Sequence, residues 1–126
     1  MDTRTKILNA SALAALAPPR PLLIAVGRFD ILRAEMTREL AAARRRTGAA
    51  SLLAVVRPAA DELASLAARA EMAAALRVVD YVFIAETGDL TTLPAGLQPV
   101  EILNLEEADA RRTRQLIEHV HTRQSV

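Results

Sequence analysis

Short apolar runs alternate along the chain with longer stretches in which apolar side chains recur every three or four positions. The first pattern is typical of strands buried on both faces, and the second of amphipathic helices. Strands are predicted at residues 22–26, 51–56, 78–84 and 100–103. Helices are predicted at residues 10–17, 33–47, 60–77 and 106–122.

The order of these elements predicts an α/β fold. Strands that are apolar on both faces and alternate with helices indicate a Rossmann-like three-layer α/β/α arrangement, with a mainly parallel sheet of about four to five strands. Right-handed crossovers place the loop after the first strand at the carboxyl edge of the sheet. We expect a single domain over residues 1–126, with an N-terminal extension carrying a short helix over 1–20 and the α/β core over 21–126.

Composition narrows the class of protein. Apolar residues make up 52% of the chain but only 2% are aromatic, so the core is expected to be aliphatic. The formal net charge of +1 gives no strong field toward nucleic acid or anionic lipid. Cysteine is absent, which excludes disulfides and thiolate metal ligands. With no apolar stretch near the roughly 20 residues of a membrane helix, we expect a soluble, cytoplasmic, bacterial-type protein that binds neither nucleic acid nor membrane.

Residues 26–36 carry the strongest functional signal. The first predicted strand runs into Gly27, and a helical pattern starts a few residues later. Free backbone N–H groups and the positive end of a helix dipole attract phosphate at such a junction. The helix begins with a cation at Arg33, an anion at Glu35 and a thioether at Met36. None of these is an evident catalytic group.

Residues 27–36, Gly-Arg-Phe-Asp-Ile-Leu-Arg-Ala-Glu-Met, resemble the G-x-F-D-x-x-H-x-G-H signature of cytidylyltransferase-like nucleotidyltransferases. Residues 69–82 are similar to the family's R-A-E-x-L-A-A-L-x-x-V-D-x-V block, and residues 6–13 resemble the lead-in to the adenylyltransferase domain of bacterial ADP-heptose synthesis enzymes. The resemblance implies a homo-oligomer of the same α/β fold. It also implies transfer of a nucleotidyl group from ATP or CTP, with Mg²⁺, to a sugar phosphate or phospho-alcohol.

The chain departs from this family where the chemistry would occur. The two histidines of the signature correspond to Arg33 and Met36, and its second glycine to Glu35. Methionine cannot donate a hydrogen bond, and losing one transition-state donor typically costs about 10²–10³ in rate. A carboxylate also repels a triphosphate, by roughly 4 kcal/mol for unit charges 4 Å apart at an effective dielectric constant of 20. No catalytic residue is assigned, and Arg33, Glu35 and Met36 are altered positions of the motif.

Two further parts of the family's phosphate machinery differ. The lysine-bearing loop before the R-A-E block is missing, since Lys6 is the only lysine in the sequence. Basic residues replace the late I-S-[ST]-T motif. The residues expected to contact a retained ligand are Gly27, Arg28, Phe29, Asp30, Arg33, Arg111, Arg112, Thr113 and Arg114. No metal site is expected, because His119 and His121 are two positions apart on a predicted helix and point to different sides.

Three functions remain open. The leading one is a nucleotidyltransferase relative without ordinary catalysis, which either retains a pocket for a nucleotide or a sugar phosphate or acts as an interaction module. If the pocket is retained, Mg²⁺ and ATP or CTP are the expected cofactors. The second is an active transferase in which Arg33 and the C-terminal arginines replace the histidines. The third is a structural or assembly subunit whose pocket is closed by Glu35. A homodimer or another protein partner is expected. Glu86 and Asp89, after the third strand, are open between a ligand role at Mg²⁺ or a ribose and loop solubility.

Overall fold

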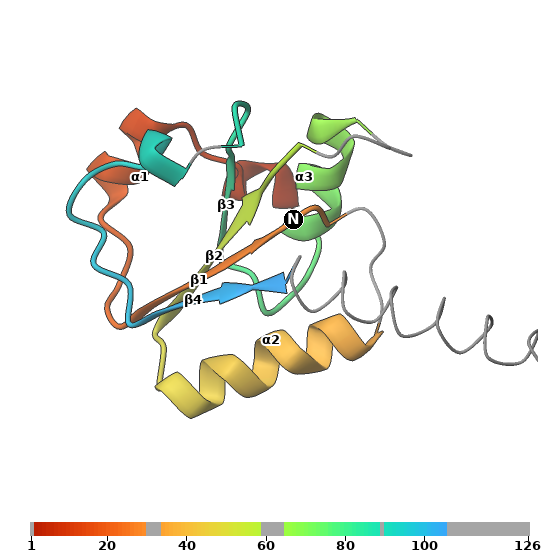
Figure 1. Ribbon diagram of the computed structural model, residues 1–126, viewed down its shortest axis with the longest axis vertical. Coiled ribbons are helices and arrows are strands. Elements are labelled where there is room, and N and C mark those ends of the chain that lie inside the picture. Colours follow the sequence, from red (N-terminus) through yellow and green to blue (C-terminus); the bar gives the residue numbers. More distant parts are fainter. Residues whose placement is uncertain (1, 30–33, 59–64, 89, 106–126) are drawn as a thin grey trace, which may run out of the picture.

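The computed structural model describes residues 2–29, 34–58, 65–88 and 90–105 (Figure 1). Four parallel strands form one sheet in the order β3-β2-β1-β4. The strands are β1 (Leu22–Gly27), β2 (Ser51–Val56), β3 (Tyr81–Ile84) and β4 (Glu101–Asn104). The helices are α1 (Ala10–Leu16), α2 (Ala34–Thr47) and α3 (Leu66–Ala74), with 3-10 turns η1 (Thr3–Lys6) and η2 (Leu90–Thr92). The predicted α/β fold with a parallel sheet is confirmed.

The sheet is covered on both faces. All residues of β1 and β2 are buried, because alternate side chains pack into two different layers. Leu23 and Ala25 belong to the cluster that contains α2 and α3, whereas Ile24 and Val26 pack with Leu13 of α1. Figure 1 shows α1 and α3 on opposite sides of the strands. None of the helices in the described ranges is both long and apolar enough to cross a membrane.

Two element boundaries differ from the prediction by three residues each, and those of α1, β1 and β4 differ by one residue. Helix α3 ends at Ala74 and β3 begins at Tyr81, so that both are shorter than the sequence pattern indicates. Between them the chain turns, with the Leu76 N–H donating to the Ala73 carbonyl at 3.1 Å and the Val79 N–H donating to the Leu76 carbonyl at 3.1 Å. Apolar, β-branched residues therefore occupy a turn here. The first five positions of the predicted helix over 60–77, residues 60–64, lie outside the described residues. The predicted helix over 106–122 also lies outside them.

Charged side chains form hydrogen bonds with backbone groups of this turn and of the amino edge of the sheet. The Lys6 ammonium donates to two carbonyls of the turn, at 3.3 and 2.8 Å. Asp80 Oδ2 accepts the Leu52 N–H at 2.9 Å and lies 2.9 Å from Arg44 Nη1. Arg44 also donates to the Val78 carbonyl at 2.9 Å. Asp80, Arg44 and the single lysine are thus structural groups, at the end of the sheet opposite Gly27.

The C-terminal end of α2 is joined to the start of β4 by a bidentate ion pair. Arg46 Nη2 lies 2.7 Å from Glu101 Oε2, and Nη1 lies 2.9 Å from Oε1. The hydrogen bonds from Arg46 hold the pKa of the Glu101 carboxyl below its usual range. A depressed folded-state pKa contributes stability that is present above the ordinary pKa of about 4.3 and is lost as the pH falls through the depressed value.

Arg46→Ala is expected to return the pKa of Glu101 to its ordinary range. A carboxyl-carbon NMR titration measures this directly, and the acid side of the stability profile should lose the part that depends on Glu101. Arg45→Ala changes the neighbouring exposed arginine and should leave the Glu101 titration unchanged. An unchanged pKa in Arg46→Ala would show that the ion pair does not persist in solution.

Candidate functional site

The candidate site lies at the carboxyl edge of the sheet, where β1 ends at Gly27. Strand β1 has β2 on one side and β4 on the other. The chain runs outward from β1 to β2 and β3 and then returns to β4, so the direction in which strands are added reverses beside β1. Open α/β sheets bind ligands in the crevice at this kind of switch point. Residues 28 and 29 follow the strand, and α2 begins at Ala34. The segment that follows Gly27 therefore joins β1 to α2 at the carboxyl edge of the sheet.

The glycine at position 27 is explained by close packing. A Cβ atom there would lie 3.2 Å from Leu105 Cβ and 3.6 Å from the Phe29 ring. The Gly27 carbonyl accepts the Arg57 N–H at 3.0 Å, which continues the pairing of β1 with β2 past the strand end. A larger residue would push apart the segments that meet here. The glycine therefore shapes the edge of the sheet, whether or not a ligand contacts its backbone.

Phe29 anchors the turn after β1. Its backbone has a φ of +54°, in the left-handed region, and its side chain is 1% exposed in the cluster that also contains Met36. Such a conformation costs a non-glycine residue about 1–3 kcal/mol, which burial of the ring offsets. The ring of Phe29, predicted to contact a ligand, lies in the core instead. Its neighbour Arg28 is exposed at the edge.

A fully buried arginine ties the edge together. Arg69 of α3 is 0% exposed, and its Nη1 donates to the Arg28 carbonyl at 2.8 Å and to the Arg57 carbonyl at 2.7 Å. These charge-assisted bonds join the segments that follow β1 and β2. This role of Arg69 was not predicted from the sequence. The sequence holds one indication of it. Arg69 lies on the same helix face as Leu66 and Ala73, where a charged side chain is rarely buried without partners.

Two of the altered motif positions, Glu35 and Met36, lie in the first turn of α2 but face different surroundings. Glu35 is exposed in the first turn of the helix. Met36 is 5% exposed and packs in the core with Leu40 and Ala43. Met36 therefore fills the interior and presents no group at the edge. The other predicted site residues lie outside the described residues: Asp30, Arg33, Arg111, Arg112, Thr113 and Arg114.

The described part of the edge offers arginine side chains on adjacent segments. Arg28 is exposed after β1, and Arg57 is half-buried after β2. Over the described ranges, no cluster of three or more histidine, aspartate or glutamate side chains could hold a metal ion, and every buried polar side-chain atom has a hydrogen-bond partner. Arginine binds phosphate oxygens through two parallel N–H groups. The arrangement can therefore bind an anion.

No protein-family model matches this chain, and comparison with curated proteins finds no related sequence.

Proposed function

We propose that the chain is a nucleotidyltransferase-like protein that binds a nucleotide or another phosphorylated small molecule after β1 and does not carry out ordinary nucleotidyl transfer. One observation carries the proposal: the turn at residues 27–29 leaves β1 at the switch point with Arg28 exposed, and Arg69 binds the backbone of that turn. The motif resemblance of the same residues supports it.

Phosphate is the ligand group that this edge suits. The backbone carbonyls of Arg28 and Arg57 both accept hydrogen bonds from the guanidinium of Arg69. Arg28 and Arg57 are therefore neighbours at the edge of the sheet. A guanidinium keeps its charge at all physiological pH values and matches the oxygen spacing of a phosphate. The backbone beneath them is held rigidly by burial of Phe29 and Arg69. A rigid frame lowers the entropic cost of ordering groups around a ligand.

Ordinary transfer needs donors aimed at the charge that develops on the phosphates. Met36 has no donor and is buried in the core, so this position supplies nothing to a reacting phosphate. Glu35, exposed in the first turn of α2, places a carboxylate where the helix dipole would otherwise favour an anion. Both features favour binding over turnover at this edge.

Phosphorylated ligands are expected to raise the thermal midpoint of the wild-type chain. Suitable probes are ATP, CTP and a hexose phosphate, each with and without Mg²⁺ at matched ionic strength. A ligand at 100 times its dissociation constant stabilises the folded state by about 2.7 kcal/mol. Arg28→Ala should reduce the shift by removing one guanidinium. The matched control is Arg45→Ala, an exposed arginine at the other end of α2, which should leave the shift unchanged.

Each result has a distinct meaning. Absence of a shift with any phosphorylated probe overturns the proposed function and favours a structural subunit. A shift that persists in Arg28→Ala places the ligand elsewhere on the chain and contradicts the assigned edge. Pyrophosphate release from ATP or CTP by the wild-type chain identifies an active transferase and overturns the proposed loss of catalysis.

A further inference from the structure

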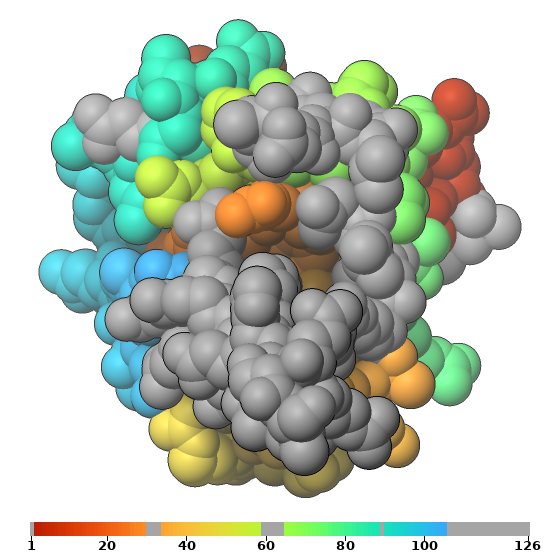
Figure 2. Space-filling model, turned by 45° about the vertical axis from the view of Figure 1, so that its right-hand side comes forward, coloured from red at the N-terminus to blue at the C-terminus, as the bar shows by residue number. Residues whose placement is uncertain are grey.

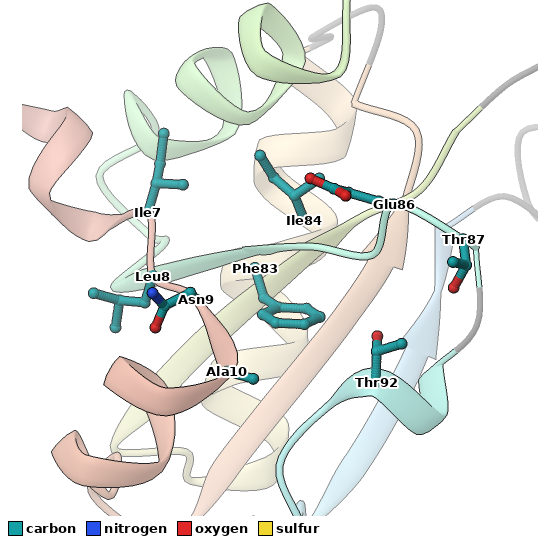
Figure 3. A pocket seen from close by; sticks show the side chains of 9 residues that line it. All are labelled: Ile7, Leu8, Asn9, Ala10, Phe83, Ile84, Glu86, Thr87 and Thr92. Atoms are coloured by element: carbon teal, nitrogen blue, oxygen red, sulfur yellow. The ribbon is translucent and has the colours of Figure 1, made fainter.

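A cavity lies at the end of β3, on the outer edge of the sheet (Figure 3). Its volume is about 540 Å³. This lies within the range of about 300–1,000 Å³ that is usual for small-molecule sites. We call it the β3-end pocket, lined by Ile7, Leu8, Asn9, Ala10, Phe83, Ile84, Glu86, Thr87 and Thr92. Neither Arg28 nor Gly27 contributes to it, so it is separate from the edge described above.

The pocket forms where the N-terminal segment leaves the sheet. Ile7 forms a parallel bridge with Val82, and the Leu8 N–H donates to the Val82 carbonyl at 2.8 Å. The next residue, Asn9, turns away as the N-cap of α1, and its side-chain oxygen accepts the Ala12 N–H at 2.8 Å. The pairing therefore stops at Leu8, and the cavity lies between the start of α1 and the last residues of β3 (Figure 3).

One side of the pocket is apolar. Phe83 is 5% exposed, and Figure 3 shows its ring between Ala10 and Thr92. Ile7, Leu8 and Ile84 complete the apolar lining. Aromatic rings favour offset or edge-to-face contact with another flat ring. This side of the pocket therefore suits a planar, weakly polar ring.

The polar side of the pocket favours hydrogen-bond donors over anions. Among the described residues of the lining, Glu86 is the one ionisable residue, and its exposed carboxylate only accepts hydrogen bonds. The Asn9 oxygen already accepts the Ala12 N–H, so the carboxamide NH₂ is the group that Asn9 offers to a ligand. No arginine or lysine lines the pocket in the part of the chain that the structure describes. A phosphate or carboxylate would meet the like charge of Glu86 without a cation to offset it.

We propose that the β3-end pocket binds a neutral nucleoside-like molecule. Its flat ring lies against Phe83, and its vicinal hydroxyl groups donate to the carboxylate of Glu86, while Asn9 donates to an acceptor of the ring. A phosphate on the same molecule is excluded by the charge of Glu86. This assignment does not depend on phosphate binding at Arg28, because the two places share no lining residue.

Calorimetric titration of the full chain tests the assignment with three matched probes. Adenosine is expected to bind. The 2′,3′-dideoxy analogue, which lacks the vicinal hydroxyls, and the 5′-monophosphate, which carries a negative charge, should each bind at least tenfold more weakly. Glu86→Gln should weaken adenosine binding about tenfold, because hydrogen bonds to an ionised acceptor are stronger than those to a neutral one.

Variants locate the binding. Ala10→Met places a larger side chain in the pocket at a helix position where methionine is well tolerated, and should abolish adenosine binding. Glu71→Gln, at an exposed position of α3, should leave it unchanged. Absence of adenosine binding, full adenosine binding by Ala10→Met, or equal binding of the monophosphate that Ala10→Met abolishes would each overturn the proposal. Glu86→Gln alters an exposed residue, so its effect on binding is measurable even if Ala10→Met fails to fold.

Discussion

Replacing Arg69 with methionine is expected to lower the free energy of unfolding by about 3 kcal/mol, because hydrogen bonds to charged groups contribute about 1.5–3 kcal/mol each. Methionine keeps an unbranched side chain that fits the buried site, but it cannot donate to the carbonyls of Arg28 and Arg57. Both carbonyl oxygens would lose a partner 2.8 and 2.7 Å away, inside the protein. The same change should weaken binding of a phosphorylated ligand, since the two segments at the edge are no longer joined.

Urea unfolding of three variants isolates the guanidinium. Arg69→Lys retains the charge but not the planar fork of donors, and its stability should lie between wild type and Arg69→Met. Arg38→Met makes the same replacement at an exposed position of α2 and should change stability by less than about 0.5 kcal/mol. If Arg69→Met were as stable as wild type, the cost of desolvating the buried guanidinium would equal the benefit of its hydrogen bonds.

Local exchange measurements would show where the effect acts. In Arg69→Met, the amides nearest to the lost bonds, at residues 27–29 and at Arg57, should exchange faster than those in the middle of β1 and β2. A uniform increase across the sheet would instead mean that the buried arginine supports the whole fold.

Strands buried on both faces were the most predictable part of the fold. The observed β2 (Ser51–Val56) has the predicted bounds, and β1 extends the prediction by Gly27 alone. Both are largely apolar runs with a clear end: β1 ends at Gly27, and β2 is followed by Arg57 and Pro58. The turn before β3 could not be predicted in the same way, because Lys6 and Arg44 satisfy its carbonyls from elsewhere in the chain. Local propensity indicated a strand where these long-range contacts stabilise a turn.

The candidate site was predictable in position but not in detail. The junction at Gly27 is visible in the sequence because a buried strand, a glycine and a helix follow one another. The roles of Phe29 and Arg69 depend on which face of each element is buried, and on partners far away in the chain. The two carbonyls that Arg69 binds are 41 and 12 residues away in sequence. No local pattern specifies such a pairing.

The burial of Met36 also changes what restoring the family motif should do. The double variant Glu35→Gly with Met36→His recreates the glycine and the second histidine of the nucleotidyltransferase signature. In a protein whose second histidine faced the ligand, this change would add a donor at the phosphate. Here position 36 is 5% exposed and packs against the residues of the core. The imidazole would enter the interior.

The double variant is therefore expected to lose about 3 kcal/mol of stability and to release no pyrophosphate. Glycine in a helix costs about 1 kcal/mol relative to alanine, and a buried polar group without a partner costs about 1–3 kcal/mol. The loss should grow below about pH 6.5, because a buried neutral histidine has a lowered pKa and the unfolded chain then binds the extra proton. Met36→Leu, which keeps an apolar side chain of similar volume, should cost less than about 1.5 kcal/mol at every pH. Pyrophosphate release by the double variant at wild-type stability would show that position 36 reaches the edge of the sheet, and that the chain is one substitution pair away from an active transferase.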